Sequence, residues 1–212
     1  MKPIGLLGGT FDPVHNGHLR LALEVREALD LSEVRLLPAP SPRLREAPDR
    51  GVKTRLKLLH SAIDDIEGLR IDDREVQQSG PTRSIETLAS FRSEFPQRSL
   101  CLILGADIAA RLDHWHDWQR LVDYAHLIFA RRPGSDLPTT GPVHEFIQQR
   151  LSNSREQLHT QSAGLVMVCD IPGLDIAARD IRARLAAGLS IDFLVPDKVK
   201  QMLLNEDPNT HG

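Results

Sequence analysis

The chain has little of what marks a secreted, membrane-spanning or nucleic-acid-binding protein. Only two cysteines occur in 212 residues. Because Cys101 and Cys169 each lie in an apolar run, we expect buried free thiols in a reducing cytoplasm, not a disulfide or a metal pair. No apolar stretch approaches the roughly 20 residues that cross a bilayer, and we expect no secretory signal. A net charge of −3 gives no basic field for nucleic acid or an anionic membrane.

Hydrophobic residues make up 41% of the chain, enough for the core of a single domain spanning residues 1–212. Short apolar runs alternate with amphipathic segments, a pattern typical of βα units. Runs such as 100–104 contain no alternating polar residue, as expected for strands covered on both faces. The pattern predicts an α/β, Rossmann-like parallel sheet of five to six strands with helices on both faces. The expected strands are 4–7, 34–38, 69–71, 100–104, 127–130 and 165–169.

Helical spacing of apolar residues predicts helices between and after these strands. They are expected at 18–29, 53–66, 85–95, 118–124, 143–151, 179–187 and 197–205. Residues from about 175 to 212 are predicted to form a small C-terminal helical subdomain. Ligands bind at the carboxyl ends of parallel strands, and the long segments 38–52 and 133–140 are expected to follow such ends. The subdomain is expected to close on the same site.

The most specific local feature is a glycine turn with two histidines after the first strand. It reads Gly8-Gly9-Thr10-Phe11-Asp12-Pro13-Val14-His15-Asn16-Gly17-His18. Glycines let backbone N–H groups approach an anion, and the following helix directs its positive end to the same place. Two imidazoles three residues apart can reach one ligand. The run predicts a phosphate site, the alternative being two incidental surface histidines, and its spacing fits neither a Walker A loop nor G-x-G-x-x-G.

Two arginines near the C-terminus offer a second anion contact. Arg179 and Arg182 are three residues apart, so they would share one face of a helix. Guanidinium groups bind polyphosphates through paired hydrogen bonds. For an isolated pair of this kind, a solvated basic helix face is the alternative.

Polar and aromatic residues after the fourth strand indicate contacts to a nucleoside. Gly105 at the strand tip allows close approach of a ligand. Asp107 would either cap the next helix or hold a ribose or ring amide. Trp115 would stack on a heterocycle or pack in the core, whereas Trp118 fits the core better. We expect no zinc site, because no further well-spaced ligands accompany His114, His116 and Asp117.

Together these motifs resemble the bacterial nicotinate-nucleotide adenylyltransferases of the nucleotidyltransferase superfamily. The likeness runs nearly from end to end. Beyond the opening motif it is carried by Leu36-Leu37-Pro38, Arg55-Leu56, Glu75, the segment 80–88, Gly105-Ala106-Asp107, Trp115, the segment 131–134 and Leu194-Val195-Pro196. The resemblance implies adenylyl transfer from ATP to nicotinate mononucleotide, which gives deamido-NAD and pyrophosphate in NAD biosynthesis.

The resemblance also implies roles for individual residues. His18 is implied as the main catalytic group, with His15 and Arg182 also on the triphosphate. The residues implied to contact the nucleotides are Gly8, Gly9, Thr10, Phe11, Arg45, Thr82, Gly105, Asp107, Trp115, Ile176 and Arg179. ATP with Mg²⁺ on its phosphates and nicotinate mononucleotide are the implied ligands. Neither nucleic acid nor membrane is an expected partner, and the sequence leaves a homo-oligomer open.

Three segments depart from the family pattern, all at the expected ligand rim. The Pro-Pro-His-Lys/Arg loop reads Pro42-Arg43-Leu44-Arg45, so the histidine is lost. The Ser/Thr-Tyr-Thr segment reads Thr82-Arg83-Ser84, so a cation replaces the ring. The Ile-Ser-x-Thr-x-x-Arg frame has Ala177 and Arg179 at its hydroxyl positions. Two alternatives stay open: another acceptor, either nicotinamide mononucleotide or pantetheine phosphate, and a nucleotide-binding regulator without catalysis.

Overall fold

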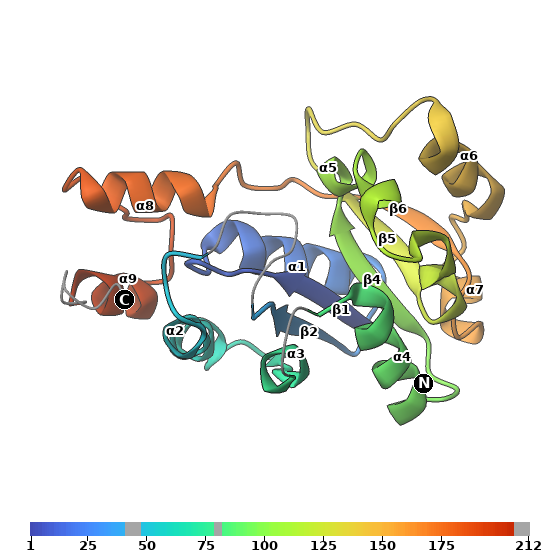
Figure 1. Ribbon diagram of the computed structural model, residues 1–212, viewed down its shortest axis with the longest axis horizontal. Helices are drawn as coiled ribbons and strands as arrows, with labels where there is room; N and C mark the ends of the chain where they lie inside the picture. Colours follow the sequence, from blue (N-terminus) through green and yellow to red (C-terminus); the bar gives the residue numbers. More distant parts are fainter. Residues whose placement is uncertain (41–47, 79–81, 206–212) are drawn as a thin grey trace.

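The centre of the fold is a six-stranded parallel sheet with the order β3-β2-β1-β4-β5-β6 (Figure 1). The computed structural model describes residues 1–40, 48–78 and 82–205. All six predicted strands are confirmed, with ends that differ by up to two residues. They are β1 Ile4–Gly9, β2 Glu33–Pro38, β3 Leu69–Ile71, β4 Leu100–Gly105, β5 His126–Arg131 and β6 Val166–Asp170.

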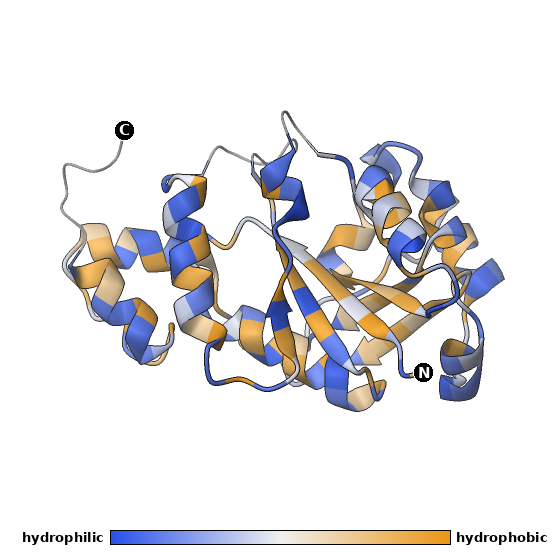
Figure 2. Cartoon of the chain, turned by 90° about the horizontal axis from the view of Figure 1, so that it is seen from below, coloured by the Kyte–Doolittle hydropathy of each residue, from blue (hydrophilic) through white to orange (hydrophobic). Residues whose placement is uncertain are grey.

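Apolar side chains cover both faces of the sheet, as the uninterrupted runs predict. Because successive residues of a strand point to opposite faces, Ile103 belongs to one core cluster, whereas Leu102 and Leu104 belong to the other. Helices α1, α2 and α9 supply the first cluster, and α4, α6 and η2 supply the second. Figure 2 shows the apolar residues concentrated along the strands and on one side of many helices.

The predicted helices are present, and several short ones were missed. The helices are α1 Asn16–Ala28, α2 Val52–Ile63, α3 Arg74–Gln77, α4 Ser84–Glu94, α5 Ala106–Ala109, η1 Leu112–His114, η2 Trp118–Asp123, α6 Gly141–Arg150, α7 Arg155–Thr160, α8 Ala178–Ala186 and α9 Asp197–Leu204. The segment predicted at 118–124 is a 3₁₀ helix, η2. Sequence analysis missed α3, α5, η1 and α7, because three to six residues are too few to show a helical period.

The C-terminal helices lie beside the first core cluster. Helix α8 buries only Ile181, and α9 buries Val199 and Leu203 against that cluster, where it packs on α2. The segment between them reaches the start of α1: Asn16 donates from its backbone N–H to Leu194 O at 2.9 Å and from its amide to Phe193 O at 2.7 Å. The C-terminal segment therefore lies at the helix end that the glycine turn enters.

Both cysteines are buried free thiols, as predicted, and burial raises the pKa of Cys101 to about 12. Within residues 1–40, 48–78 and 82–205, none of the helices has the length and apolar character needed to cross a membrane.

Candidate active site

The glycine turn joins the end of β1 to the start of α1. A Cβ at Gly8 would meet no atom within 4 Å, so this strand tip is open to a ligand. A Cβ at Gly9 would lie 2.9 Å from the Phe11 ring, so glycine is required there for packing. Phe11 is buried with a positive φ of 49°, and its ring packs against Gly9.

The two histidines of the turn stack on each other. Their ring centroids are 3.6 Å apart with an interplanar angle of 23°, and Phe11 meets His18 edge-on at 5.0 Å. His15 precedes the first residue of α1 and is 5% exposed. A Cβ on Gly17 would lie 3.0 Å from His15 Nδ1, so Gly17 makes room for this ring. The predicted pair is therefore formed at the positive end of the helix.

Burial sets the charge of His15. It lowers the pKa of His15 to about 4, with a smaller contribution from the nearby positive charge of Arg132. The imidazole is therefore neutral at pH 7 in the protein without ligand. Its Nδ1 is buried and has no hydrogen-bond partner in the described part of the chain.

A buried carboxylate anchors the segment 49–50, which follows residues 41–47. Asp12 is 2% exposed, and its Oδ2 accepts a hydrogen bond from the backbone N–H of Asp49 at 2.7 Å. Its Oδ1 lies 3.3 Å from Nη1 of Arg50. Because an unpaired carboxylate would be costly at this depth, Asp12 fixes the 49–50 segment against the glycine turn.

Arg182 reaches the same place from α8. Its Nη1 donates to the backbone oxygen of Asp12 at 2.8 Å, and its Nε lies 2.6 Å from the Asp49 carboxylate. The structure thus brings Arg182 to the glycine turn, 170 residues away in sequence. Arg179, predicted to share this role, is 82% exposed and pairs with Asp180 at 3.1 Å. In this arrangement Arg179 belongs to the solvated face of α8.

Arg55, to which no role was assigned from the sequence, holds the surrounding loops together. Arg55 of α2 is fully buried. It donates to four backbone carbonyls at 2.7–3.1 Å, which belong to Thr10, Ala39, Pro40 and Arg50. One guanidinium therefore binds the glycine turn and the described segments that lie before residue 41 and after residue 47. The signal in the sequence was Arg55-Leu56 at the head of a predicted helix, but no pattern shows which carbonyls a long side chain will reach.

The residues predicted for the second nucleotide lie around β4 and α4. Thr82 donates to the partly buried carboxyl of Glu75 at 3.1 Å, and Thr87 donates to the same group at 2.7 Å. Burial raises the pKa of Glu75. Asp107 is exposed in the first turn of α5, and its carboxylate lies against Gly105, where a Cβ would clash with it. Asp107 lies in the first turn of α5 and not at its N-cap position, which Gly105 occupies.

Of the two tryptophans, Trp118 packs against Phe146 with ring centroids 4.9 Å apart, as expected for a core residue. Trp115 is partly exposed and contacts the same core cluster. Ile176 is partly buried beside Gly17 and thus close to His15. Arg45 and the departure at Leu44 lie outside the described residues.

Comparison with known proteins now places the chain. A model of the cytidylyltransferase-like family matches residues 6–184. A protein of Chromohalobacter salexigens named "Probable nicotinate-nucleotide adenylyltransferase" is 43% identical over 203 residues, covering 95% of this chain and 93% of that protein. A Marinobacter nauticus protein of the same name is 40% identical over 199 residues, covering 93% and 92%. The chain belongs to the nicotinate-nucleotide adenylyltransferases of the cytidylyltransferase-like family.

The fold agrees with this membership. The solved nicotinic acid mononucleotide adenylyltransferase of Plasmodium falciparum, complexed with NaAD, superposes with a TM-score of 0.74 over 96% of each chain. At 16% identity this likeness shows the fold alone.

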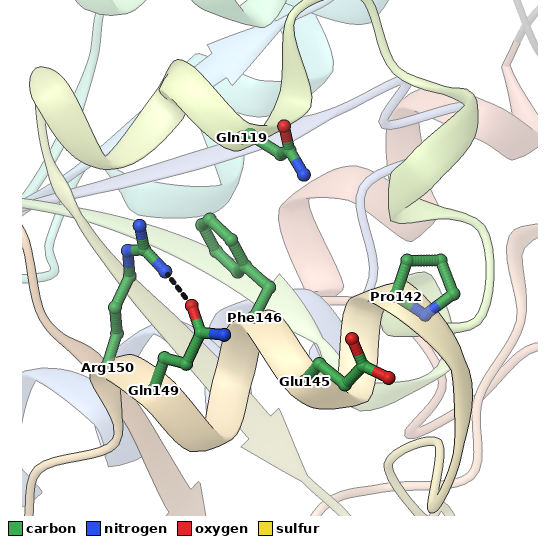
Figure 3. Close-up of a pocket in the computed structure, with 6 residues that line it drawn as sticks. All are labelled: Gln119, Pro142, Glu145, Phe146, Gln149 and Arg150. Atoms are coloured by element: carbon green, nitrogen blue, oxygen red, sulfur yellow. Dashed lines mark hydrogen bonds between the residues drawn. The ribbon is translucent and has the colours of Figure 1, made fainter.

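The surface of the described residues includes two open hollows. One is an open pocket of about 380 Å³ at the carboxyl ends of β5 and β6, lined by Arg132, Pro133, Gly134, Ser135, Pro172, Gly173 and Asp175. The other, of about 230 Å³, lies between η2 and α6, where Arg150 stacks over Phe146 at 4.2 Å (Figure 3). No predicted site residue lines either hollow, although Asp175 of the first directly precedes Ile176 in the chain.

Proposed function

We propose that the chain transfers the adenylyl group of ATP to nicotinate mononucleotide, forming deamido-NAD and releasing pyrophosphate in NAD biosynthesis. The observation that carries the proposal is the stacked pair of His15 and His18 at the start of α1, with Arg182 held beside the same turn. Identity of about 40% to the named relatives over nearly the whole chain supports it.

The reaction needs no protein nucleophile. A phosphate oxygen of the acceptor attacks the α-phosphorus of ATP in line, a new P–O bond forms, and the bond to the pyrophosphate oxygen breaks. Catalysis is then positioning and stabilisation of charge on the phosphates. The backbone N–H groups of the turn and of the first turn of α1 hold the phosphates. His18 donates a hydrogen bond to the transferring phosphate, and Arg182 binds the leaving pyrophosphate.

The second nucleotide would occupy the region of Thr82, Asp107 and Trp115. The indole of Trp115 offers a stacking face for the pyridine ring, and the carboxylate of Asp107 is exposed to accept a hydrogen bond from a ribose hydroxyl. The rival acceptors are nicotinamide mononucleotide and pantetheine phosphate. A cytoplasmic location and a homo-oligomer remain predictions from the sequence.

Mg²⁺ would enter with ATP and neutralise part of the triphosphate charge. Mg²⁺ keeps several waters and binds substrate phosphates readily. Within the described residues no three His, Cys, Asp or Glu side chains come together as a metal-ligand group. We therefore assign the metal to the phosphates of ATP and name no side chain as its ligand.

The test is pyrophosphate release by the purified protein with ATP and Mg²⁺, with the three acceptors offered in parallel. We expect release with nicotinate mononucleotide. His18→Ala should lose about 2–4 kcal/mol of transition-state stabilisation, as when one oxyanion donor is removed. His60→Ala is the matched control, because His60 is an exposed residue of α2.

Each outcome separates the candidate functions. Release with another acceptor would keep the chemistry and change the specificity. ATP binding without release for any acceptor would favour the regulator. A folded His18→Ala protein with unchanged turnover would contradict the role of His18.

A further inference from the structure

The start of α1 is anchored by a segment from the other end of the chain. Asn16, the first residue of α1, donates its backbone N–H to Leu194 O at 2.9 Å and its side-chain amide to Phe193 O at 2.7 Å. His15, at the N-cap position, makes no side-chain cap. Because the first N–H groups of a helix have no partner within it, the two distant carbonyl groups do here what a capping side chain would do.

The segment that supplies these carbonyl groups is a tight turn with an unfavourable residue at its third position. The backbone N–H of Leu194 donates to Ile191 O at 3.2 Å and closes the turn 191–194. Phe193 has a φ of 63° in this turn, a conformation that glycine adopts readily and that is strained for a residue with a Cβ. The side chain of Phe193 is 90% exposed, so packing of its ring does not offset the strain.

Contacts on both sides of Phe193 hold the turn in place. Ile191 and Val195 are buried in the first core cluster, and Lys200 of α9 pairs with Asp192. A strained conformation persists only where its surroundings determine it. The buried flanks and the two bonds from Asn16 are such surroundings, so the turn presents its carbonyl groups to α1 in a fixed position.

Asn16 stands between the two imidazoles of the candidate site. It directly follows His15, and the backbone N–H of His18 donates to His15 O at 2.9 Å, so the three residues share one helix start. A displacement of about 1 Å can cost a catalytic group much of its effect. We propose that Asn16 is a positioning residue that ties the start of α1 to the turn 191–194. This contact keeps the rings of His15 and His18 stacked.

The first test is Asn16→Ala, which removes the amide donor and keeps the backbone N–H. The inference rests on the proposed function for this kinetic readout, taken from pyrophosphate release. A misplaced His18 weakens an interaction of the transition state, so kcat should fall about 10-fold while the KM for ATP changes less than twofold. Arg20→Met is the control, because Arg20 loses a side-chain hydrogen bond to Glu24 on the same helix and should keep the wild-type kcat.

A matched pair at Phe193 tests the turn without changing α1. Phe193→Gly permits the positive φ and should keep kcat close to the wild-type value. Phe193→Pro fixes φ near −65°, which the turn cannot accommodate, and should lower kcat as far as Asn16→Ala does.

The position of His15 can be followed without turnover. Its pKa is about 4 in the folded protein because the ring is buried. NMR titration of the histidine ring protons, with His15→Gln to assign the signal, should show this pKa rising toward 6.5 in Asn16→Ala and in Phe193→Pro. Phe193→Gly and Arg20→Met should keep the wild-type pKa.

Three results would overturn the proposal. The first is a folded Asn16→Ala protein in which both kcat and the pKa of His15 are unchanged. The second is a raised KM for ATP at unchanged kcat, which would assign Asn16 to ATP binding. The third is an equal loss of kcat in Phe193→Gly and Phe193→Pro, which would give the role to the ring and not to the backbone. Failure of the proposed function is distinct, because it shows as no pyrophosphate release by the wild type and leaves the titration of His15 interpretable.

Discussion

The Asp49 carboxylate lies 2.6 Å from Nε of Arg182, and the backbone N–H of Asp49 donates to Asp12. One residue therefore links α8 to the glycine turn. Arg182 is 26% exposed and Asp49 54% exposed, so the pair orients the guanidinium more than it stabilises the fold. Asp49 acts through Arg182 as a positioning residue.

Asp49→Ala should raise the KM for ATP about two- to fivefold, because exposed pairs contribute roughly 0.2–1 kcal/mol. The KM for ATP of Asp49→Asn should lie between those of Asp49→Ala and the wild type, since the amide oxygen of asparagine still accepts a hydrogen bond from Nε of Arg182. Asp64→Ala is the control, as Asp64 pairs only with Lys198 at the surface within the described residues. A lower KM in Asp49→Ala would mean that Asp49 competes with phosphate for Arg182.

Arg55→Met should destabilise the protein by about 3 kcal/mol or more, because buried carbonyl oxygens lose their donor at roughly 1–3 kcal/mol each. The measurement is urea unfolding followed by circular dichroism. Arg20→Met serves as the control, since Arg20 pairs only with Glu24 on an exposed face of α1 within the described residues. An unchanged unfolding midpoint would show that water replaces the guanidinium at no cost.

The sheet could be predicted from the sequence because buried parallel strands leave uninterrupted apolar runs. The run from Leu100 to Leu104 needs no partner to be recognised, since each residue is buried wherever the neighbouring strands lie. The glycine–histidine run was equally readable, because its function lies in a local turn and a helix start. The short helices α3 and α5 left no period, and α5 begins where Gly105 ends β4.

The electrostatics of the site could not be predicted, because they depend on contacts between distant segments. The spacing of His15 and His18 predicts two imidazoles at one ligand, but it does not show the burial that lowers the pKa of His15 to about 4. Arg179 and Arg182 looked equivalent as a pair three residues apart. Only the path of α8 past Asp12 and Asp49 separates them.

His15 should make the stability of the protein depend on pH. Its folded pKa of about 4 lies below the unfolded value of 6.5. Below pH 6.5 the unfolded chain therefore binds a proton that the folded protein does not, and stability falls as the pH drops from about 6.5 to about 4. The full loss is about 3 kcal/mol. The contribution is fully present above pH 6.5.

Urea unfolding at pH 7.5 and pH 4.5 measures this effect. His15→Gln should lose less stability than the wild type between the two pH values. His126→Gln should change in the same direction, because burial also lowers the pKa of His126. His60→Gln, at an exposed position, should keep the wild-type dependence. If His15→Gln also kept the wild-type dependence of stability on pH, His15 would bind its proton as readily in the folded state as in the unfolded chain.

Glu75 should affect the KM for nicotinate mononucleotide without affecting the KM for ATP. Its partly buried carboxyl is the common acceptor of Thr82 and Thr87, so it fixes the segment that leads into α4. Glu75→Gln keeps the size of the side chain but replaces one acceptor oxygen with an NH₂ group, so one hydroxyl loses its acceptor. With roughly 1 kcal/mol per hydrogen bond, the KM for nicotinate mononucleotide should rise about fivefold, and that for ATP should stay unchanged.

Glu86→Gln is the control, because Glu86 lies exposed in the first turn of α4. An equal rise in both KM values for Glu75→Gln would assign Glu75 to the fold as a whole and not to the position of Thr82.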